Sequence, residues 1–188
     1  IYVLIKGPNI QNIWANMLYV NNFLPYDDQA MNWTWSLAIE EQFYLLYPLL
    51  LGLIMKHSQR PAFWLWFSFG LSFVICFVII MTDEAVRNTP GSMIVADPKA
   101  HAHHFSVLYD NLYTRYGSLV AGCLAAYYQH YHRDQVSAFL NSVRGRLLGY
   151  LAVAVLTVLM VLPVLTKAFD DWQILSIVYQ TVARNLYA

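Results

Sequence analysis

The sequence is poor in charged residues. Aspartate, glutamate, lysine and arginine make up 12% of the 188 residues, against about 25% in soluble domains. Eleven basic and eleven acidic residues balance to a formal net charge of zero, so nothing indicates nucleic-acid binding. The shortage of charge argues against an ordinary soluble domain.

Cysteine is nearly absent. Cys76 and Cys123 both lie inside apolar runs, where small buried hydrophobic side chains are the simplest interpretation. Two residues so placed provide neither a disulfide framework nor a metal-ligand spacing. A signal peptide with a charged start is missing as well, and the chain begins with Ile1. We therefore expect an internal piece of a longer protein.

Apolar and aromatic residues are abundant instead. Hydrophobic residues make up 59% of the chain, with 14 Tyr, 10 Phe and 6 Trp, a composition that fits aromatic belts at a lipid interface. A membrane-crossing helix needs about 20 mostly apolar residues. Runs of that length are Ser36–Met55, Ala62–Met81, Leu108–Tyr128 and Leu147–Thr166. The sequence thus predicts an all-α, multi-pass helical membrane bundle with about four complete spans.

Further segments flank these runs. One or two partial spans are expected at the chain ends, in Ile1–Ile5 and Trp172–Ala188. Asn9–Phe23 has apolar residues at helical spacing, which predicts an amphipathic helix at the membrane interface; the alternative is a re-entrant helix or one packed within a loop. Residues 83–107 contain the turn signal Asp97-Pro98, and we expect an outer polar loop there.

The distribution of basic residues predicts the orientation. The segments 56–61 and 130–146 contain Lys56, Arg60, Arg133, Arg144 and Arg146. We expect these two segments to face the cytoplasm, so the first span enters the membrane from the outer side.

Two adjacent carboxylates, Glu40 and Glu41, lie near the start of that first span. A charged side chain in a span costs roughly 2.5–3.5 kcal/mol or more unless it is paired or hydrated, and such residues often mark sites or pathways. The alternative is an ion pair that locks two helices together. Helical geometry places Glu40 on a stripe with Ser36, Tyr44 and Tyr47, and Glu41 about 100° around the axis.

Arg115 lies near the start of the third expected span. A guanidinium there could clamp an anionic group or orient Glu40 or Glu41, because it makes bidentate contacts with carboxylates and phosphates. The alternative is an arginine that snorkels to the interface. Small residues at a spacing of four would let its helix approach another closely. They are Gly117, Ala121 and Ala125, and Ser118, Gly122 and Ala126.

A histidine cluster, His101, His103 and His104, lies in the expected outer loop with Asp97 and Asp110 nearby. Imidazoles and a carboxylate could bind zinc. Ligand spacing on a loop is weak evidence, however, so we expect a solvated loop and no metal site.

The motif around the two glutamates has a known counterpart. Residues Trp35–Leu50 resemble the W-S-L-x-x-E-E-Q-F-Y-L-L-x-P-L-L signature of the acyltransferase-3 family. Thr114 and Arg115, followed by Leu119 and Gly122, are similar to its T-R-x-x-x-L-x-x-G stretch. The members are multi-pass membrane O-acyltransferases, mostly bacterial, that modify sugars.

The resemblance implies transfer of an acyl group, with acetyl expected, from acyl-CoA to a hydroxyl of a carbohydrate or cell-surface glycan. Residues 1–188 would then be an internal part of one transmembrane acyltransferase domain, inactive alone. The expected partners are acyl-CoA as donor substrate, a glycan or lipid-linked sugar acceptor and the bilayer, without nucleic acid or a bound cofactor. The implied location is the bacterial inner (plasma) membrane.

The resemblance also suggests roles for residues. The expected catalytic residues are Glu40 and Glu41, and the expected substrate-binding residues are Trp35, Ser36, Tyr44 and Arg115. By composition alone, Trp33 and Trp35 are interpreted as interface anchors. The histidine that the family is proposed to use as a base, with the Arg-rich motif after it, is not in this sequence, and Gly117 stands where the family often has Asp.

Two other classes of protein stay open. In a transporter or pore, intramembrane carboxylates relay protons or bind cations. A membrane scaffold without catalytic activity would also have this composition.

Overall fold

The computed structural model describes residues 10–58, 60–89, 96–165 and 177–182, which form helices and no strand. The long helices are α3 (Trp35–His57), α4 (Pro61–Thr82), α8 (Leu112–Tyr131) and α10 (Val143–Leu165). The short ones are η1 (Ile10–Asn12), α2 (Ile13–Met17), η2 (Asn21–Phe23), η3 (Tyr26–Asp28), η4 (Asn32–Thr34), α5 (Glu84–Asn88), α7 (Pro98–His104), the π-helix η5 (Phe105–Tyr109) and α9 (Arg133–Asn141).

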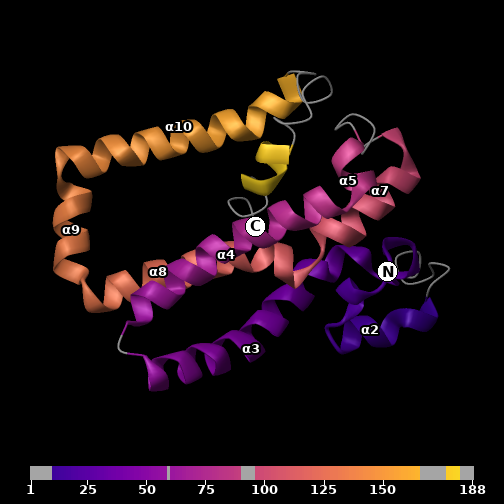
Figure 1. Ribbon diagram of the computed structural model, residues 1–188, viewed down its shortest axis with the longest axis horizontal. Coiled ribbons are helices and arrows are strands. Elements are labelled where there is room, and N and C mark those ends of the chain that lie inside the picture. The colour runs from indigo at the N-terminus through magenta and orange to yellow at the C-terminus, as the bar shows by residue number, and fades with distance from the viewer. Residues whose placement is uncertain (1–9, 59, 90–95, 166–176, 183–188) are drawn as a thin grey trace.

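The centre of the molecule is the pair α4 and α8, which lie side by side, with α3 packed against them at one end and diverging at the other (Figure 1). The first core cluster joins these three helices. It consists of Phe43 and Tyr47 of α3, Leu65 of α4, and Val120 and Leu124 of α8. Between membrane helices such contacts stabilise association through van der Waals packing, and this cluster fixes where α3 meets α8.

A second core cluster lies where α4 ends. Cys76 and Ile80 of α4 pack with Val86 of α5, Leu108 of η5 and Ile177. The buried Cys76 agrees with the interpretation of its thiol as a small hydrophobic group, and both cysteines are free. Ile177 belongs to the described segment 177–182, which therefore packs on the same core.

Two helical segments, Asn32–His57 and Pro61–Thr82, are long and apolar enough to cross a membrane. The described residues give a third span if α9 and α10, which meet at an angle of 79°, are counted together. Helix α8 is more polar and is not among them. The prediction of a helical membrane protein is supported, whereas the number of four complete spans stays a prediction. The expected partial spans at the chain ends lie largely outside the described residues.

The two polar segments differ from what the sequence predicts. The single amphipathic helix expected over Asn9–Phe23 is wrong: residues 10–23 form the short helices η1, α2 and η2, interrupted at Tyr19, whose φ is 56°. In residues 83–107, the described part contains α5, α7 and the start of η5 rather than an extended loop. Asp83 and Asp97 cap α5 and α7 by accepting hydrogen bonds from backbone N–H groups.

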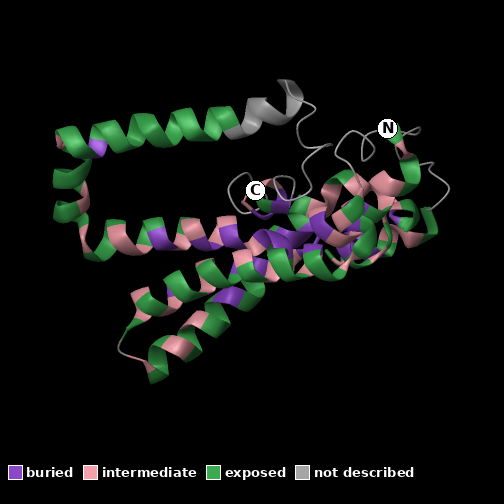
Figure 2. Cartoon of the chain, turned by 45° about the horizontal axis from the view of Figure 1, so that its top comes forward, coloured by how far each residue is buried: buried purple, intermediate pink, exposed green. Residues whose placement is uncertain are grey.

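Helices α9 and α10 form an arm that extends from the bundle (Figure 1), and Figure 2 shows α10 exposed along most of its described length. The bend between them depends on Gly145, which is buried. A Cβ atom at this position would collide with the backbone carbonyl of Phe139 in α9. Only glycine therefore permits the close approach of the two helices.

The role of Gly145 in the bend between α9 and α10 can be tested by two matched substitutions. Gly145→Ala is expected to open the bend and destabilise the arm by about 1–3 kcal/mol, because backbone must move. Gly149→Ala, where a Cβ has open space, is expected to stabilise the helix by about 0.5–1 kcal/mol. Thermal unfolding, with spin-label distances between Ser137 and Val155, measures both. Equal behaviour of the two variants would show that Gly145 does not set the bend.

Candidate functional site

The two glutamates lie on the exposed side of α3. The buried side of the helix carries Ala38, Ile39 and Phe43, whereas Glu40 and Glu41 are both exposed. Neither carboxylate has a hydrogen bond or ion pair with any residue that the structure describes. The alternative of an ion pair that locks two helices is therefore not seen in the described part of the chain.

The stripe expected from helical geometry is divided by packing. Tyr47 is buried and stacks on Phe43 with ring centroids 4.4 Å apart. Ser36, Glu40 and Tyr44 remain exposed, Tyr44 by 59%. On this face of α3, the side chains are exposed from Ser36 to Tyr44. One turn later, at Tyr47, the same face packs into the core.

Gln42, directly after the glutamates, ties α3 to the segment before it. Its Nε2 donates to the Tyr19 carbonyl at 2.6 Å and to Asn22 Oδ1 at 2.7 Å. Asn22 Nδ2 donates back to Gln42 Oε1 at 3.3 Å. Two side-chain amides paired in this way satisfy each other at a partly buried position. The sequence reasoning missed this role, although Gln42 belongs to the motif itself.

Arg115 is buried, with 4% of its surface exposed. Its Nε donates to the Tyr109 carbonyl at 2.9 Å. The guanidinium carbon lies 4.3 Å from the centroid of the Tyr109 ring and 5.0 Å from that of Trp35. Such cation–π contacts stabilise a charge by about 0.5–1 kcal/mol when exposed and by about 2 kcal/mol or more when desolvated.

This environment decides between the interpretations of Arg115. A snorkelling arginine is wrong, because the side chain is almost fully covered. Arg115 contacts Trp35, one of the expected site residues, and is not bonded to Glu40 or Glu41 in the structure. Trp33 is 53% exposed, as an interface anchor would be, whereas Trp35 packs on the guanidinium. Tyr109 completes the contact, and no sequence signal pointed to it.

Buried polar side chains next to Arg115 in the sequence hold the start of its helix in place. Asp110 is fully buried and its Oδ2 accepts a hydrogen bond from Gln29 Nε2 at 2.7 Å. Thr114, also fully buried, donates to the Leu108 carbonyl at 2.8 Å. These bonds hold the start of α8 against η5 and against the segment that contains Gln29. They fix Arg115 in position because it follows Thr114 directly.

The three histidines do not converge. His103 Nε2 lies 3.0 Å from Asp83 Oδ2, and His104 Nε2 lies 2.8 Å from Gln180 Oε1. His101 stacks edge-on against Tyr26 with centroids 5.3 Å apart. Among the described residues, no group of three His, Cys, Asp or Glu side chains has a geometry that could hold a metal ion.

The Asp83–His103 contact joins α5 to α7. Partial burial raises the pKa of Asp83, but hydrogen bonds from the Val86 N–H and from His103 outweigh it and lower the pKa below its ordinary value of 3.8. A carboxylate with a lowered pKa in the fold stabilises it above the ordinary pKa and stops doing so as the pH falls through the folded value. Asp83 therefore stabilises this end of the molecule at neutral pH.

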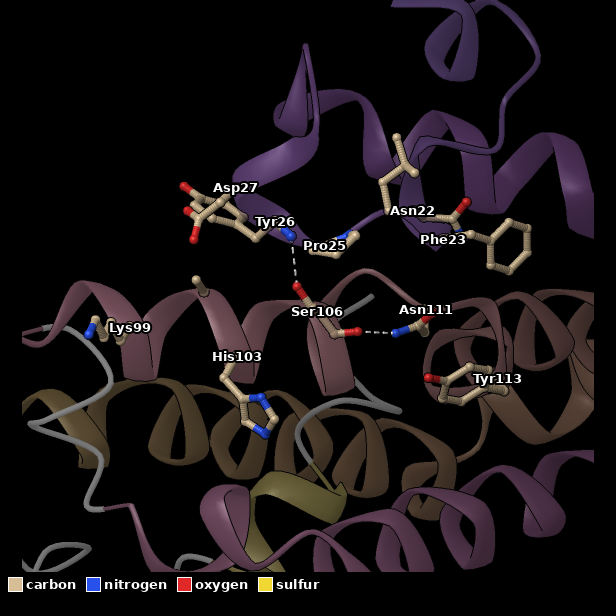
Figure 3. Close-up of a pocket in the computed structure, with 12 residues that line it drawn as sticks. Asn22, Phe23, Pro25, Tyr26, Asp27, Lys99, His103, Ser106, Asn111 and Tyr113 are labelled. Carbon is tan, nitrogen blue, oxygen red and sulfur yellow. Dashed lines mark hydrogen bonds between the residues drawn. The ribbon is translucent and has the colours of Figure 1, made fainter. Parts of the chain in front are cut away.

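Three of the cavities in the described part of the chain lie among these helices. A polar one of about 650 Å³ lies between residues 22–27 and the α7–η5 segment (Figure 3). An aromatic one of about 430 Å³ is lined by Trp33, Trp35 and Tyr109, among others. An apolar one of about 540 Å³ lies between α3, α4 and α8. The aromatic cavity borders the two rings that hold Arg115.

Replacement of Arg115 tests its contacts with the Trp35 and Tyr109 rings and with the Tyr109 carbonyl. Arg115→Lys is expected to lower the free energy of unfolding by about 1.5–3 kcal/mol, the range for hydrogen bonds to charged groups, because an ammonium reproduces neither the Nε bond nor the planar stacking. Thermal unfolding of the full-length protein in lipid nanodiscs measures it. Arg144→Lys, at an exposed position of α10, is the control. A comparable loss of unfolding free energy in both variants would show that these contacts do not stabilise the protein specifically.

The dependence of the α5 cap on the charge of Asp83 can be tested by changing the pH. Protection of the Val86 amide from hydrogen exchange, corrected for intrinsic rates, is expected above about pH 4 and should be lost as the pH falls further, because protonation removes the carboxylate that it bonds. Asp83→Asn, which can still cap a helix, should show a weaker pH dependence. If both proteins respond identically, Asp83 is not the titrating group.

Comparison with known proteins gives one family and one relative. A family model described as an acyltransferase domain matches residues 1–183. Nose resistant to fluoxetine protein 6 of Caenorhabditis elegans is 28% identical over 119 residues, which are 61% of this chain and 14% of that protein. The chain thus corresponds to a small part of this relative. No solved structure matches the chain.

The family match covers both stretches on which the sequence resemblance rests, Trp35–Leu50 and Thr114–Gly122. In the structure, the first residue of one stretch and the arginine of the other are in contact, through Trp35 and Arg115. The chain therefore belongs to the acyltransferase-3 family.

Proposed function

We propose that the protein is a membrane O-acyltransferase that moves an acyl group, acetyl in the simplest case, from acyl-CoA to a hydroxyl of a carbohydrate or cell-surface glycan. The observation that carries the proposal is the state of Glu40 and Glu41. They lie in the family motif on an apolar helix, exposed and without a partner in the described part of the chain. Packing does not explain two such carboxylates, whereas a reaction at this surface does.

Acyl transfer to a hydroxyl requires removal of the hydroxyl proton, stabilisation of the oxyanion and positioning of both substrates. Glu40 or Glu41 would accept the hydrogen bond of the acceptor hydroxyl, or orient a histidine base supplied by another span. Ser36 and Tyr44 share this exposed face and would contact the substrates. Acyl-CoA would take part as a substrate, without a permanently bound cofactor.

Arg115 would hold an anionic group of a substrate. The side chain supports this because it is almost fully covered and no carboxylate among the described residues is hydrogen-bonded to it. Trp35 and Tyr109 keep the guanidinium plane in place. A guanidinium held in place by its surroundings matches a carboxylate, phosphate or oxyanion.

For the location we propose a multi-pass position in a cell membrane. The apolar helices support it. The nematode relative indicates that proteins similar to this chain occur outside bacteria, so a bacterial inner membrane is one case of this proposal. A transporter that uses the same glutamates is the alternative, and family membership favours acyl transfer over it.

The reaction is tested with the full-length protein and acyl-CoA. Glu40→Gln and Glu41→Gln keep the shape of the side chains and remove the charge. At least one is expected to lower the rate of acylation by about 100-fold or more, the range for loss of a proton-transferring group. Mass spectrometry of glycans from membranes with and without the protein measures the product.

Glu84→Gln is the matched control, because Glu84 is an exposed carboxylate of α5 outside the motif. It is expected to leave the rate unchanged. Wild-type rates in both motif variants would exclude a catalytic role for the pair. Absence of any acyl-CoA-dependent product with the wild-type protein would exclude the reaction itself and favour transport or a scaffold.

A further inference from the structure

The end of α8 lies at the height where α4 enters the membrane. Trp66 belongs to the first two turns of α4, a helix long and apolar enough to cross a membrane. Its Nε1 donates a hydrogen bond to the Tyr128 hydroxyl at 3.0 Å, and Tyr128 is in the last turn of α8, next to Tyr127 and Tyr131. Tryptophan and tyrosine gather at the headgroup level of a bilayer. These aromatic residues therefore mark the height of one membrane surface.

Helix α9 begins at this height and lies across the helix that follows it. Arg133, its first residue, comes two positions after the end of α8, and α9 meets α10 at 79°. Helix α10 has 23 residues, which give about 34 Å at 1.5 Å per residue and match a hydrocarbon core of about 30 Å. With α10 across the bilayer, α9 runs along its surface.

The side chains of α9 divide into an apolar and a polar face. Val136, Phe139 and Leu140 are three and four residues apart and so share one face, on which Phe139 and Leu140 are exposed. Ser137 and Asn141 lie away from that face. A helix divided in this way at a membrane surface turns its apolar side toward lipid chains and its polar side toward headgroups. Lipid chains would thus cover Phe139 and Leu140.

Three arginines flank α9. Arg133 begins this helix, and Arg144 and Arg146 lie in the first turn of α10. All three are exposed, and none forms an ion pair with a residue that the structure describes. Asp134 is the only acidic residue between positions 120 and 160. Because the helix dipole disfavours cations in a first turn, helix stability does not account for these arginines, whereas an anion outside the chain does.

We propose that α9, together with the first turn of α10, is a binding surface for anionic phospholipids. Arginine makes bidentate hydrogen bonds with phosphate oxygens, and the apolar face of α9 meets the chains below the same headgroups. A soluble acidic partner would match the charges but leave the apolar face uncovered, whereas a lipid matches both. The inference concerns binding and does not depend on the proposed reaction.

The turn between α3 and α4 extends this surface. Lys56 and Arg60 are exposed there, and Figures 1 and 2 both place this turn at the same end of the molecule as α9. The two basic segments that the sequence predicts on the cytoplasmic side thus lie at one end. Anionic lipids of the cytoplasmic leaflet attract basic residues next to membrane spans, so the partner fits the predicted orientation.

Photolabelling in nanodiscs tests the surface. The full-length protein is placed in phosphatidylcholine with a trace of phosphatidylglycerol that carries a diazirine near its headgroup. Labelling, mapped by mass spectrometry, is expected on residues 133–146, with competition by unlabelled phosphatidylglycerol. Arg144→Gln is expected to lower it about five-fold, the effect of one arginine near an anionic surface. Arg144→Lys keeps the charge and is expected to lower it less.

Lys99→Gln is the matched control. Lys99 is an exposed cation of α7, which lies at the other end of the molecule (Figure 1). This substitution is expected to leave the labelling of residues 133–146 unchanged. A phosphatidylcholine probe with the same diazirine should label these residues less and should be insensitive to all three substitutions.

The apolar face is tested by spin labels at Leu140 and at Ser137 in the same nanodiscs. The label at Leu140 is expected to collide mainly with oxygen, which dissolves in lipid, because this position faces the chains. The label at Ser137 is expected to collide more with a water-soluble nickel complex. Paramagnetic relaxation measures both collision rates.

Three results would overturn the inference: equal labelling by the two lipid probes, equal effects of Arg144→Gln and Lys99→Gln, or a label at Leu140 as accessible to the nickel complex as that at Ser137. Labelling by phosphatidylglycerol in a protein that transfers no acyl group would leave the lipid-binding surface in place and contradict only the proposed function.

Discussion

A buried guanidinium is the constraint on which the rest of this structure depends. Arg115 is almost fully covered, and an ion in that position is tolerated only with partners that replace water. The rings of Trp35 and Tyr109 and one backbone carbonyl supply them. Because these groups come from α3 and η5 and Arg115 belongs to α8, the charge fixes three elements at one point. The start of α3, with its carboxylates, is thereby held at a defined place on the bundle.

The sequence predicted the long helices because their signal is local. Ala62–Met81 has no charge, and α4 covers Pro61–Thr82 accordingly. The same reasoning failed at Asp97-Pro98, which resembles a turn. An aspartate cap followed by proline at the first helical position is also how a helix starts, and here it starts α7. Short helices of this kind lack an apolar run, so packing against neighbours decides whether they form.

The site was predictable where it follows from the motif and unpredictable where it depends on contacts between distant residues. Glu40, Glu41 and Arg115 stand out as charges in apolar surroundings. Tyr109 and Gln29 do not, because an aromatic ring or an amide becomes informative only when its partner is known. The distance in sequence between Gln29 and Asp110, which share a hydrogen bond, shows why local patterns could not find that pair.

The arm formed by α9 and α10 has a consequence for how the protein assembles. Among the described residues, helix α10 packs mainly on α9, so its apolar surface adds little to the core of α3, α4 and α8. Its exposed apolar surface must therefore be covered by lipid or by other protein surfaces. The core helices α3 and α4 are themselves long and apolar enough to cross a membrane, so a change in bilayer thickness would act on the core as well as on the arm.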